Sequence, residues 1–526
     1  MDNTLTTKFS LNQGWLTEKD AVVFGVFEGE EIPCGLGFKK ETAEKEAELL
    51  FPIFSKIKRY FAHKDFSGKL GKVAVIYPEN VLYKRVILCG LGKKEELDAE
   101  KLRQVASQAI AAAEATDAAK ISFTLFGSPL QRAEDRLRYI FEGAVLTLYK
   151  FNAYKSKGAE KESGAKITEV EFLLPEIIEA DEVSAWQKQL ERNVTIAEAV
   201  YFARNIVNQP SSVVTPQFLA ETAEALAKQY PGISVRVMRK TELKDRGMNG
   251  ILTVGGGSDK EPVLITLEYS PASASEKTVA LVGKGVCFDS GGLSLKSAEN
   301  MMEMKMDMAG AAAVMGAIVT AARLQLPVKV SAVIPAVENV PSPTAYKPGD
   351  IITSASGKTI EVLNTDAEGR IILADALHYA AAELKPTYVI DLATLTYACE
   401  LALGNHYAGL LGNNDELLGL ITEASERTGE KVWLFPFDDC YKKQIESDVA
   451  DVKNIGGKTA GVITSSLFLK EFVGEHKGYA HIDIAGTAIL SEKNHYRPKG
   501  GSGFGVRLLV DFLEHLGGVS EAIKAE

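Results

Sequence analysis

Short apolar runs and longer stretches of helical periodicity alternate along the chain. Runs of about four to eight mostly apolar residues predict buried strands, and apolar positions three or four residues apart predict helices. In the first third, the sequence predicts a helix over residues 99–115 and strands over residues 73–77, 85–91, 121–126 and 170–174. The charged, glycine-containing stretch 155–166 is expected to be a solvated loop.

One long helical stretch, residues 182–207, separates this region from the rest and ends near Pro210. After it the alternation resumes, with strands predicted over residues 234–238, 263–267, 279–282, 328–334, 388–392 and 480–484. Short apolar strands that alternate with helices favour a mostly parallel sheet flanked by helices on both faces. We therefore predict an α/β protein with a smaller N-terminal αβ domain, residues 1–180, and a larger C-terminal domain, residues 181–526, that includes the connecting helix.

Length and composition agree with this organisation. The chain has 526 residues, which is too many for one ordinary core, and 46% of them are hydrophobic and 25% charged, as in soluble globular proteins. Its 70 acidic and 59 basic residues leave a net charge of -11, so the chain as a whole has no electrostatic footprint for nucleic acid.

The cysteines and the apolar stretches bear on location. Five scattered cysteines without a CxxC pair favour a reducing compartment, and we expect a cytoplasmic protein with buried thiols. The N-terminal MDNTLTTKFSLNQ lacks the basic and apolar regions of a secretory signal. The longest apolar stretch, residues 308–324, is rich in alanine and glycine, so we expect a buried helix rather than a membrane span.

Candidate chemistry is concentrated in three segments of the second region. They read VGKGVCFDSGGLSLK from Val282, MKMDMAG from Met304 and NTDAEGR from Asn364. The first follows a predicted strand, and open α/β sheets build their sites at the carboxyl ends of strands. Together the segments supply seven candidate site residues: Lys284, Asp289, Lys296, Asp307, Asp366, Glu368 and Arg370.

Purely structural roles compete for several of these residues. The first segment has the composition of a solvated loop, Asp307 can favour the first turn of a helix, and Thr365 with Glu368 matches a capping box. However, the helix after Asp307 is almost wholly apolar, so a carboxylate that enters this core needs a partner or a metal. If NTDAEGR is extended, Asp366, Glu368 and Arg370 share one face.

The set of ligands points to metal chemistry without histidine. Carboxylates shared between two cations are typical of dinuclear hydrolases. The motif HExxH is absent, and the seven histidines are isolated from these segments. An oxygen-rich site suits Mn²⁺ or Zn²⁺.

These segments resemble those of the leucine aminopeptidase (cytosol aminopeptidase) family. NTDAEGR matches that family's signature in full, and the resemblance extends in order over about residues 199–516. The N-terminal third resembles the family only in its length and its αβ pattern. The other matching segments are VGKGVCFDSGGLSLK, MEMKMDMAGAAAV from Met302, KPGDIITSASGKTIEVL from Lys347, DVKNIGG from Asp451, HIDIAGTA from His481 and GSGFGVRLL from Gly501.

The resemblance implies a metal site with two divalent cations, Zn²⁺ or Mn²⁺, in each subunit. It assigns Lys284, Asp289, Asp307 and Glu368 to one cation. It assigns Asp289, Asp366 and Glu368 to the other, with Asp366 contributing both its side chain and its backbone carbonyl. Asp289 and Glu368 would thus bridge the two ions.

The resemblance also implies the reaction. The enzyme would release the N-terminal residue, leucine and other apolar residues included, from peptides with a free N-terminus. Lys296 would polarise the scissile carbonyl, and Arg370 would hold a bicarbonate ion that serves as general base. Family members are homohexamers, and we expect the same here.

Departures and rival interpretations remain open at this stage. Tyr397 in ATLTYA and Pro343 in NVPSPTAY stand where the family usually has glycine, and Tyr397 is predicted at the rim of the pocket for the first side chain. One alternative is a dinuclear phosphatase or another amidohydrolase, but such an enzyme has no use for a lysine ligand such as Lys284. The other alternative is an oligomeric scaffold or DNA-binding protein with a residual peptidase site, against which the acidic balance argues.

Overall fold

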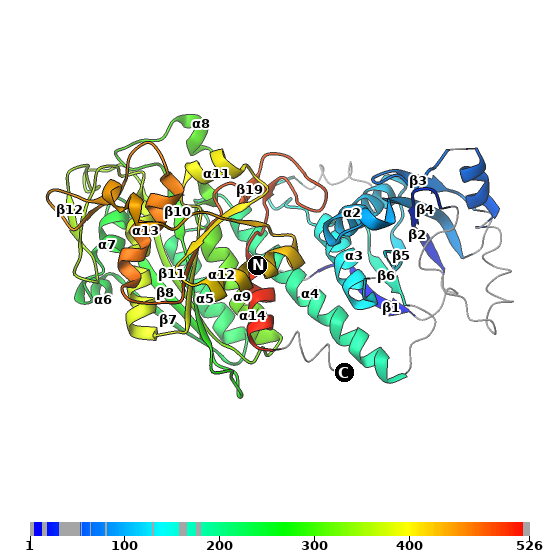
Figure 1. Ribbon diagram of the computed structural model, residues 1–526, viewed down its shortest axis with the longest axis horizontal. Helices are drawn as coiled ribbons and strands as arrows, with labels where there is room; N and C mark the ends of the chain where they lie inside the picture. Colours follow the sequence, from blue (N-terminus) through cyan, green and yellow to red (C-terminus); the bar gives the residue numbers. More distant parts are fainter. Residues whose placement is uncertain are drawn as a thin grey trace. The chain divides into compact units, whose positions relative to one another are not determined.

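The chain forms two compact units. The computed structural model describes residues 5–12, 18–30, 53, 55–63, 65–78, 82–128, 131–156, 166–174 and 180–518. Contacts divide the chain into Met1–Glu198 with Glu492–Pro498, and Ala199–Ser491 with Lys499–Glu526 (Figure 1). The division falls within α4 (Ala180–Asn208), which is the long helix predicted over residues 182–207. The predicted two-domain α/β architecture is confirmed, while the domain limit at residue 180 stays a prediction.

The first unit is built on a six-stranded sheet. In spatial order its strands are β1 (Lys8–Asn12), β6 (Glu169–Leu173), β5 (Lys120–Thr124), β2 (Lys19–Phe27), β4 (Tyr83–Gly92) and β3 (Val73–Ile76). All neighbouring pairs are parallel except β3 and β4. This unit also contains α2 (Ala99–Ala115), α3 (Ala133–Thr147) and the short η1 (Lys94–Glu96).

The predicted elements of this unit are present, but β1, β2 and α3 were not predicted. The helix over residues 99–115 is α2, whose N-cap Asp98 accepts a hydrogen bond from the backbone of Lys101. The four predicted strands are β3, β4, β5 and β6. The sequence analysis missed β2, although KDAVVFGVF is the continuous apolar run of a strand that has neighbours on both sides. Most of the predicted loop 155–166 lies outside the described residues.

The second unit contains a nine-stranded sheet. In spatial order its main path is β16 (Val432–Leu434), β15 (Ala408–Gly412), β18 (Tyr479–Asp483), β14 (Tyr388–Ala393), β9 (Thr278–Gly283), β11 (Lys329–Asn339), β8 (Val263–Tyr269) and β7 (Ile233–Met238), and β10 (Gly285–Asp289) pairs with β11. The central strands β18, β14, β9 and β11 run parallel to one another. The pairs β15–β18, β11–β8 and β8–β7 are antiparallel, so the sheet is mixed towards its edges.

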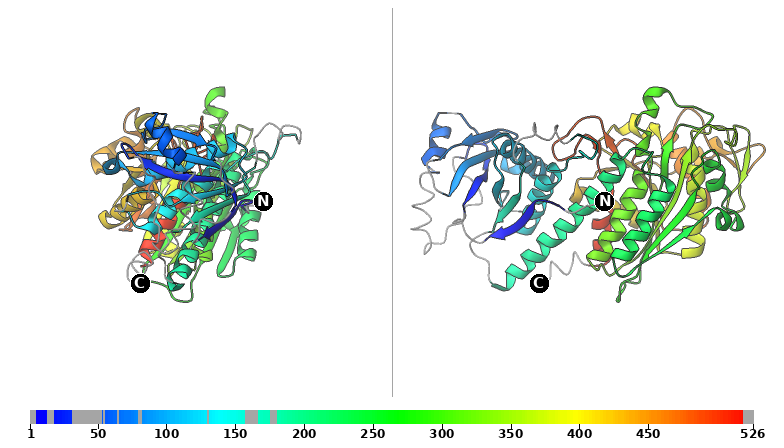
Figure 2. Two further views of the ribbon diagram at one scale, coloured as in Figure 1. Left: turned by 90° about the vertical axis from the view of Figure 1, so that its right-hand side faces the viewer. Right: turned by 180° about the vertical axis from the view of Figure 1, so that it is seen from behind.

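Helices cover both faces of this sheet (Figure 2). On one face lie α5 (Pro216–Gln229), α9 (Ala309–Arg323), α12 (Asp415–Thr428) and α14 (Val506–Leu516). On the other face lie α7 (Asn249–Gly255), α10 (Glu368–Tyr379), which continues as the π-helical η4 (Ala380–Leu384), and α13 (Gly461–Val473). The apolar core on the α10 side includes residues of β9, β11, α10 and α13.

The apolar stretch at residues 308–324 forms α9, and its residues are buried from Ala309 to Ala322. By length and composition, residues Ala298–Arg323 include a window that is apolar enough to cross a membrane. Of that window, 89% is buried inside the structure. The segment is therefore a core helix of the second unit, as expected.

Short elements complete the second unit and surround its strand ends. They are α6 (Lys240–Asp245), α8 (Ala298–Met301), η3 (Met304–Met306), α11 (Tyr397–Leu403), η5 (Asp439–Ile445), β12 (Ile351–Thr353), β13 (Thr359–Glu361), β17 (Val452–Lys453), β19 (Ile489–Leu490) and β20 (Gly500–Gly501). The parallel strands β9, β10, β11, β14 and β18 all end on one edge of the sheet, where an α/β protein places its site.

Candidate metal centre

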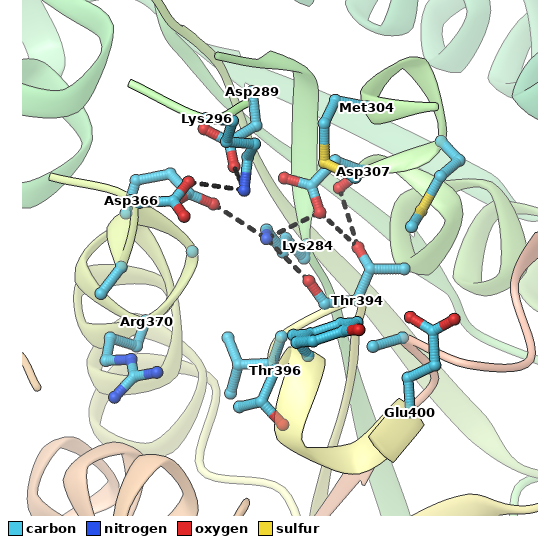
Figure 3. A pocket seen from close by; sticks show the side chains of 17 residues that line it. Lys284, Asp289, Lys296, Met304, Asp307, Asp366, Arg370, Thr394, Thr396 and Glu400 are labelled. Atoms are coloured by element: carbon cyan, nitrogen blue, oxygen red, sulfur yellow. Dashed lines mark hydrogen bonds and ion pairs between the residues drawn. The ribbon is translucent and has the colours of Figure 1, made fainter. Parts of the chain in front are cut away.

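One pocket of the second unit lies at these strand ends (Figure 3). Its lining includes all seven candidates from the sequence: Lys284, Asp289, Lys296, Asp307, Asp366, Glu368 and Arg370. They come from segments up to about eighty positions apart, which only the parallel sheet and its connections bring together.

Lys284 occupies the break between β9 and β10, so its side chain leaves the centre of the sheet. Its ammonium lies 2.8 Å from Asp307 Oδ1 and 2.9 Å from Glu368 Oε1, and it donates to the carbonyl of Thr394 at 2.8 Å. A Cβ at Gly369 would lie 2.5 Å from Lys284 Cε. The glycine in NTDAEGR is therefore needed to let the lysine pass the first turn of α10.

Asp289 is the last residue of β10. Its Oδ1 accepts hydrogen bonds from the backbone of Gly291 at 2.9 Å and from Asn339 Nδ2 at 2.8 Å. Its Oδ2 lies 2.9 Å from the ammonium of Lys296. Gly291 has a φ of +85°, a left-handed conformation that lets the loop turn back towards Lys296. Both carboxylate oxygens of Asp289 are thus held in place.

Asp307 lies between η3 and α9 and is 3% exposed. The helix begins only at Ala309, and its N-cap Met308 makes no side-chain capping bond. Asp307 Oδ1 instead accepts from the hydroxyl of Thr394 at 2.6 Å, while Oδ2 has no hydrogen-bond partner among the described residues. The capping interpretation is wrong, and the buried Oδ2 is available to a ligand.

The NTDAEGR segment is not extended. Asp366 lies in a turn, and Glu368 is the first residue of α10. The capping box is also absent, because the N-cap of α10 makes no side-chain bond. The Thr365 hydroxyl instead donates to the carbonyl of Gly291 at 2.6 Å and accepts from the backbone of Ser294 at 2.7 Å. These two hydrogen bonds join the NTDAEGR turn to the loop that carries Asp289 and Lys296.

The carboxylates converge. Asp289, Asp366 and Glu368 each offer an oxygen, and these oxygens all lie within 4.8 Å of one another. The ammonium of Lys296 lies 2.5 Å from Asp366 Oδ1, and Asp307 is joined to Glu368 through Lys284. Four carboxylates therefore face two lysines in one mostly buried cluster.

This excess of negative charge shifts the titration of the carboxyl groups. Burial, followed by Glu368 and Asp307, raises the pKa of Asp289 well above its usual value. Burial raises the pKa of Asp307 to about 7, although Lys284 opposes the shift. Burial and Glu368 also raise the pKa of Asp366. For Glu368, burial acts in the same upward direction, but Lys284 and Lys296 outweigh it and the pKa is lowered.

These observations fit a metal centre. Three carboxyl groups are less acidic than usual because they are buried and lie beside other carboxylates, and a buried oxygen of Asp307 has no partner among the described residues. Bound cations would supply the missing charge. Carboxylate oxygens with one amine suit hard or borderline divalent ions.

Arg370 lies one turn into α10 and is buried. Burial lowers the pKa of its guanidinium to about 10, although Glu368 and Asp483 favour the charged form. Its Nε has no hydrogen-bond partner among the described residues. A buried guanidinium with a free donor is suited to bind a small anion.

The sequence analysis missed three residues that orient this site. Each is the last residue of a central strand or comes directly after one. Asn339 ends β11 and holds Asp289, and Thr394 follows β14 and holds Asp307. Asp483 ends β18 and accepts from the Thr396 hydroxyl at 2.7 Å. The signal that identifies them is their position at the carboxyl ends of buried strands.

Tyr397 lines the pocket while 65% of it remains exposed, so it lies at the pocket rim, and its place beside the first side chain of the substrate stays a prediction. It begins α11, on the wall that also carries Leu395 and Glu400. This wall is less charged than the metal-ligand side of the pocket.

Comparison with known proteins gives consistent results. The model of the cytosol aminopeptidase family catalytic domain matches residues 201–510, and that of the family's N-terminal domain matches residues 23–158. A probable cytosol aminopeptidase of Geobacter sulfurreducens is 46% identical over 456 residues, which cover 86% of this chain and 89% of that protein. One of Roseiflexus castenholzii is 41% identical, covering 94% of this chain and 96% of that protein.

A solved structure matches as well. The bottromycin maturation enzyme BotP in complex with Mn superposes with a TM-score of 0.81 at 32% identity, covering 95% of this chain and 100% of that one. The two family models together match parts of both units, and the solved structure shares the fold of the chain. The chain therefore belongs to the cytosol aminopeptidase family and is a metal-dependent aminopeptidase.

Proposed function

We propose that this aminopeptidase works with two divalent cations, Mn²⁺ or Zn²⁺, held by Lys284, Asp289, Asp307, Asp366 and Glu368. The observation that carries the proposal is the convergence of three carboxylates within 4.8 Å, beside an Asp307 oxygen that has no partner among the described residues. BotP, which has the same fold, was solved in complex with Mn. When bound, such ions would lower the pKa of a water molecule and polarise the scissile carbonyl.

Lys284 must lose a proton to act as a ligand, because only the neutral amine has a lone pair to donate. Without a metal the opposite holds: burial disfavours the ammonium, but Asp307 and Glu368 outweigh burial and raise the pKa of Lys284. Cations bound by the same carboxylates would reverse this balance. Metal binding is therefore coupled to deprotonation of Lys284.

Lys296 has a different role in this proposal. Without a metal its pKa is also raised, because Asp289, Glu368 and Asp366 outweigh the effect of burial. In its proposed role Lys296 would have to stay charged when the cations bind. With Asp289 and Asp366 serving as metal ligands, the Lys296 ammonium would be free to donate to the carbonyl oxygen of the scissile peptide bond. A positioned donor of this kind stabilises the oxyanion that forms when water attacks.

Arg370 completes the proposed machinery as the residue that holds bicarbonate near the cations. Its buried guanidinium and unpartnered Nε support an anion site. The bicarbonate would supply the general base for the attacking water. Arg370 itself stays protonated, because its pKa of about 10 lies above neutral pH.

We also propose that the protein acts in the cytoplasm, as a homohexamer, on peptides with a free N-terminus. The relatives are named cytosol aminopeptidases, which supports the location. Trp433, Leu434 and Val449 are each more than half exposed in the second unit. Exposed apolar residues of this size are suited to contacts between subunits.

The test combines metal content with turnover. The full-length protein is stripped with EDTA and titrated with Mn²⁺ or Zn²⁺, while bound metal and hydrolysis of leucyl-p-nitroanilide are followed together. Activity should require metal and reach its plateau at two equivalents per chain. A plateau at one equivalent would contradict the two-cation site, and full activity of the stripped protein would contradict metal dependence.

A further inference from the structure

One carboxylate of the pocket lies away from the metal ligands. Glu400 is on α11, one helical turn after Tyr397, and both residues line the pocket. Figure 3 shows Glu400 extending from α11 on the opposite side of the pocket from Asp289, Lys296 and Arg370. It therefore belongs to the wall of the pocket rather than to the proposed metal centre.

The backbone that carries Glu400 is anchored to the central sheet. Thr396, the N-cap of α11, accepts from the backbone of Cys399 and donates to Asp483 at the end of β18. The loop after β18 also packs closely against α11, since a Cβ at Gly486 would lie 2.2 Å from the carbonyl of Gly404 and 3.3 Å from Glu400 Cα. A side chain on so constrained a support can contribute to specificity.

The charge of Glu400 is not compensated by the protein. Lys284 and Lys296, the two lysines of the pocket, are each paired with two other carboxylates. Among the described residues, Glu400 has no hydrogen bond or ion pair from its side chain. Burial and the negative charge of Glu303 both raise the pKa of Glu400. Glu400 is also exposed, so water solvates its charge, and a cation beside it would favour the charged form.

Several residues that line the same pocket as Glu400 are apolar or aromatic. They are Met304, Met306, Leu395 and Tyr397. A ligand side chain that runs along this wall would bury its methylene groups against thioether, aliphatic and aromatic surfaces before it reaches a carboxylate. Lysine and arginine have this shape, an apolar stem with a cation at its tip.

We propose that Glu400 is a specificity-determining residue that makes the enzyme favour peptides whose first residue is lysine or arginine. The proposal rests on the proposed function, in that it assigns a substrate class to the same pocket. In the bound peptide, the scissile carbonyl lies at the carboxylate cluster and the first side chain runs along the Met304 and Leu395 wall. Its terminal cation then pairs with Glu400.

Glu400 has one competing role, as the group that binds the α-amino group of the substrate. Figure 3 favours the side-chain role, because Glu400 lies apart from Asp289 and Lys296, where the backbone of the substrate would react. The two roles differ in a measurable way. Every substrate has the α-amino group, whereas only basic residues place a cation at the end of the side chain.

The experiment compares kcat/KM for lysyl-, arginyl-, norleucyl- and leucyl-p-nitroanilide in the metal-loaded, full-length enzyme. Norleucine matches the stem of lysine without its charge. Glu400→Gln should lower the lysine-to-norleucine ratio by about 10-fold, as expected for loss of one charged partner in a partly exposed site. The matched control is Glu303→Gln, which removes a nearby charge that does not line the pocket and should change the ratio by less than about 2-fold.

A charge reversal and a binding measurement extend the test, and the binding measurement does not depend on turnover. Glu400→Lys should invert the preference and favour glutamyl- over lysyl-p-nitroanilide. In calorimetry, the phosphonate analogue of lysine should bind wild type more tightly than that of norleucine, and Glu400→Gln should remove the difference. This result would support the role of Glu400 even if the anilides were not hydrolysed, which would count against the proposed function alone.

Two outcomes would overturn the proposal. An equal loss for lysyl and norleucyl substrates in Glu400→Gln would assign Glu400 to the α-amino group or to structure. An unchanged ratio in both turnover and binding would show that the carboxylate does not meet the first side chain.

Discussion

Both units of this protein bury charged groups, but they balance them differently. In the first unit, Glu142 of α3 accepts from Arg103 of α2 at 2.6 Å and from Arg138 at 3.0 Å. Arg103 also pairs with Glu100 at 3.6 Å, so two carboxylates there face two guanidinium groups. In the pocket of the second unit, four carboxylates face two lysines. The first arrangement joins α2 to α3, and the second leaves an excess of negative charge in the pocket.

The pKa shifts of charged groups differ between the two units in the same way. In the first unit, the hydrogen bond from Lys19 lowers the pKa of Glu169. Burial opposes the charge of Lys19, but Glu169 and Glu171 outweigh burial and raise its pKa. Both partners of that pair thus favour their charged forms. In the pocket, burial and neighbouring carboxylates raise the pKa of Asp289 instead. Matched buried charges are typical of structure, and unmatched ones mark a ligand site.

Glu368→Gln tests this difference between the two units with the largest expected effect. Glu368 converges with Asp289 and Asp366, so the variant should lose bound metal and at least about 10³-fold in kcat. Metal analysis and leucyl-p-nitroanilide hydrolysis measure both effects. Glu299→Gln, an exposed acid on α8, is the control and should behave as wild type. Near-normal turnover of Glu368→Gln with two metals per chain would show that the site is assigned wrongly.

Lys296→Ala should separate catalysis from metal binding. Lys296 pairs with Asp289 and Asp366 but is proposed to act on the substrate, so the variant should keep both metals. It should lose about 10²–10³-fold in kcat, the usual effect of deleting one oxyanion donor. Loss of metal in this variant would instead exchange the roles of Lys284 and Lys296.

Glu142→Gln tests the other side of the comparison. Removing the carboxylate leaves two buried guanidinium groups, Arg103 and Arg138, without their shared anion. The free energy of unfolding of the first unit should fall by about 3 kcal/mol. Urea denaturation measures this loss, while kcat/KM of the folded, metal-loaded enzyme should stay unchanged. A loss of bound metal in Glu142→Gln would mean that its charges also serve the site.

Acid should weaken metal binding in the second unit. Cations bind the ionised carboxylate, and the pKa of Asp307 without metal is about 7. As the pH falls below 7, protons therefore compete, and metal affinity should drop by up to about tenfold per pH unit for each proton displaced. Mn²⁺ titrations between about pH 5.5 and 8 measure this change. Activity lost in acid should return with added metal, and an acid limb that excess metal cannot move would indicate a titrating catalytic group instead.

Asp289→Asn should give the smallest change in stability, with opposite signs without and with metal. Without metal it removes one of the crowded carboxylates whose raised pKa makes the charged form unfavourable. In EDTA at pH 7 the variant should melt higher than wild type by about 2 °C. With Mn²⁺ it should melt lower, because a proposed metal ligand is gone. A lower melting temperature in both conditions would show that the cluster is not under charge strain.

Much of the fold was predictable, because it follows from local pattern. The helix over residues 99–115 and the strand over residues 279–282 are present as α2 and β9, since their apolar periodicity is a property of the segment alone. The expectation of a mostly parallel sheet holds for its centre. The antiparallel edges formed by β7, β8 and β15 were not predicted, because strand pairing depends on segments distant in the sequence.

The residues of the candidate site were predictable from the sequence, but their hydrogen bonds were not. The motifs alone brought together seven residues that line one pocket. Local reasoning then offered capping roles for Asp307 and Thr365, and both were wrong. Asp307 accepts from Thr394, 87 positions later, and Thr365 donates to Gly291, 74 positions earlier. No local rule can predict a hydrogen bond across such a separation.

The sequence by itself thus determined which chemistry is available: carboxylates, two lysines and an arginine in motifs of one enzyme family. The tertiary structure decided how many charges meet in one place and which remain unmatched. Asp307 Oδ2 without a partner among the described residues, and Glu400 on a wall away from the lysines, are consequences of packing. The physical reason is that burial and long-range Coulomb interactions depend on distances in space, which the order of residues does not contain.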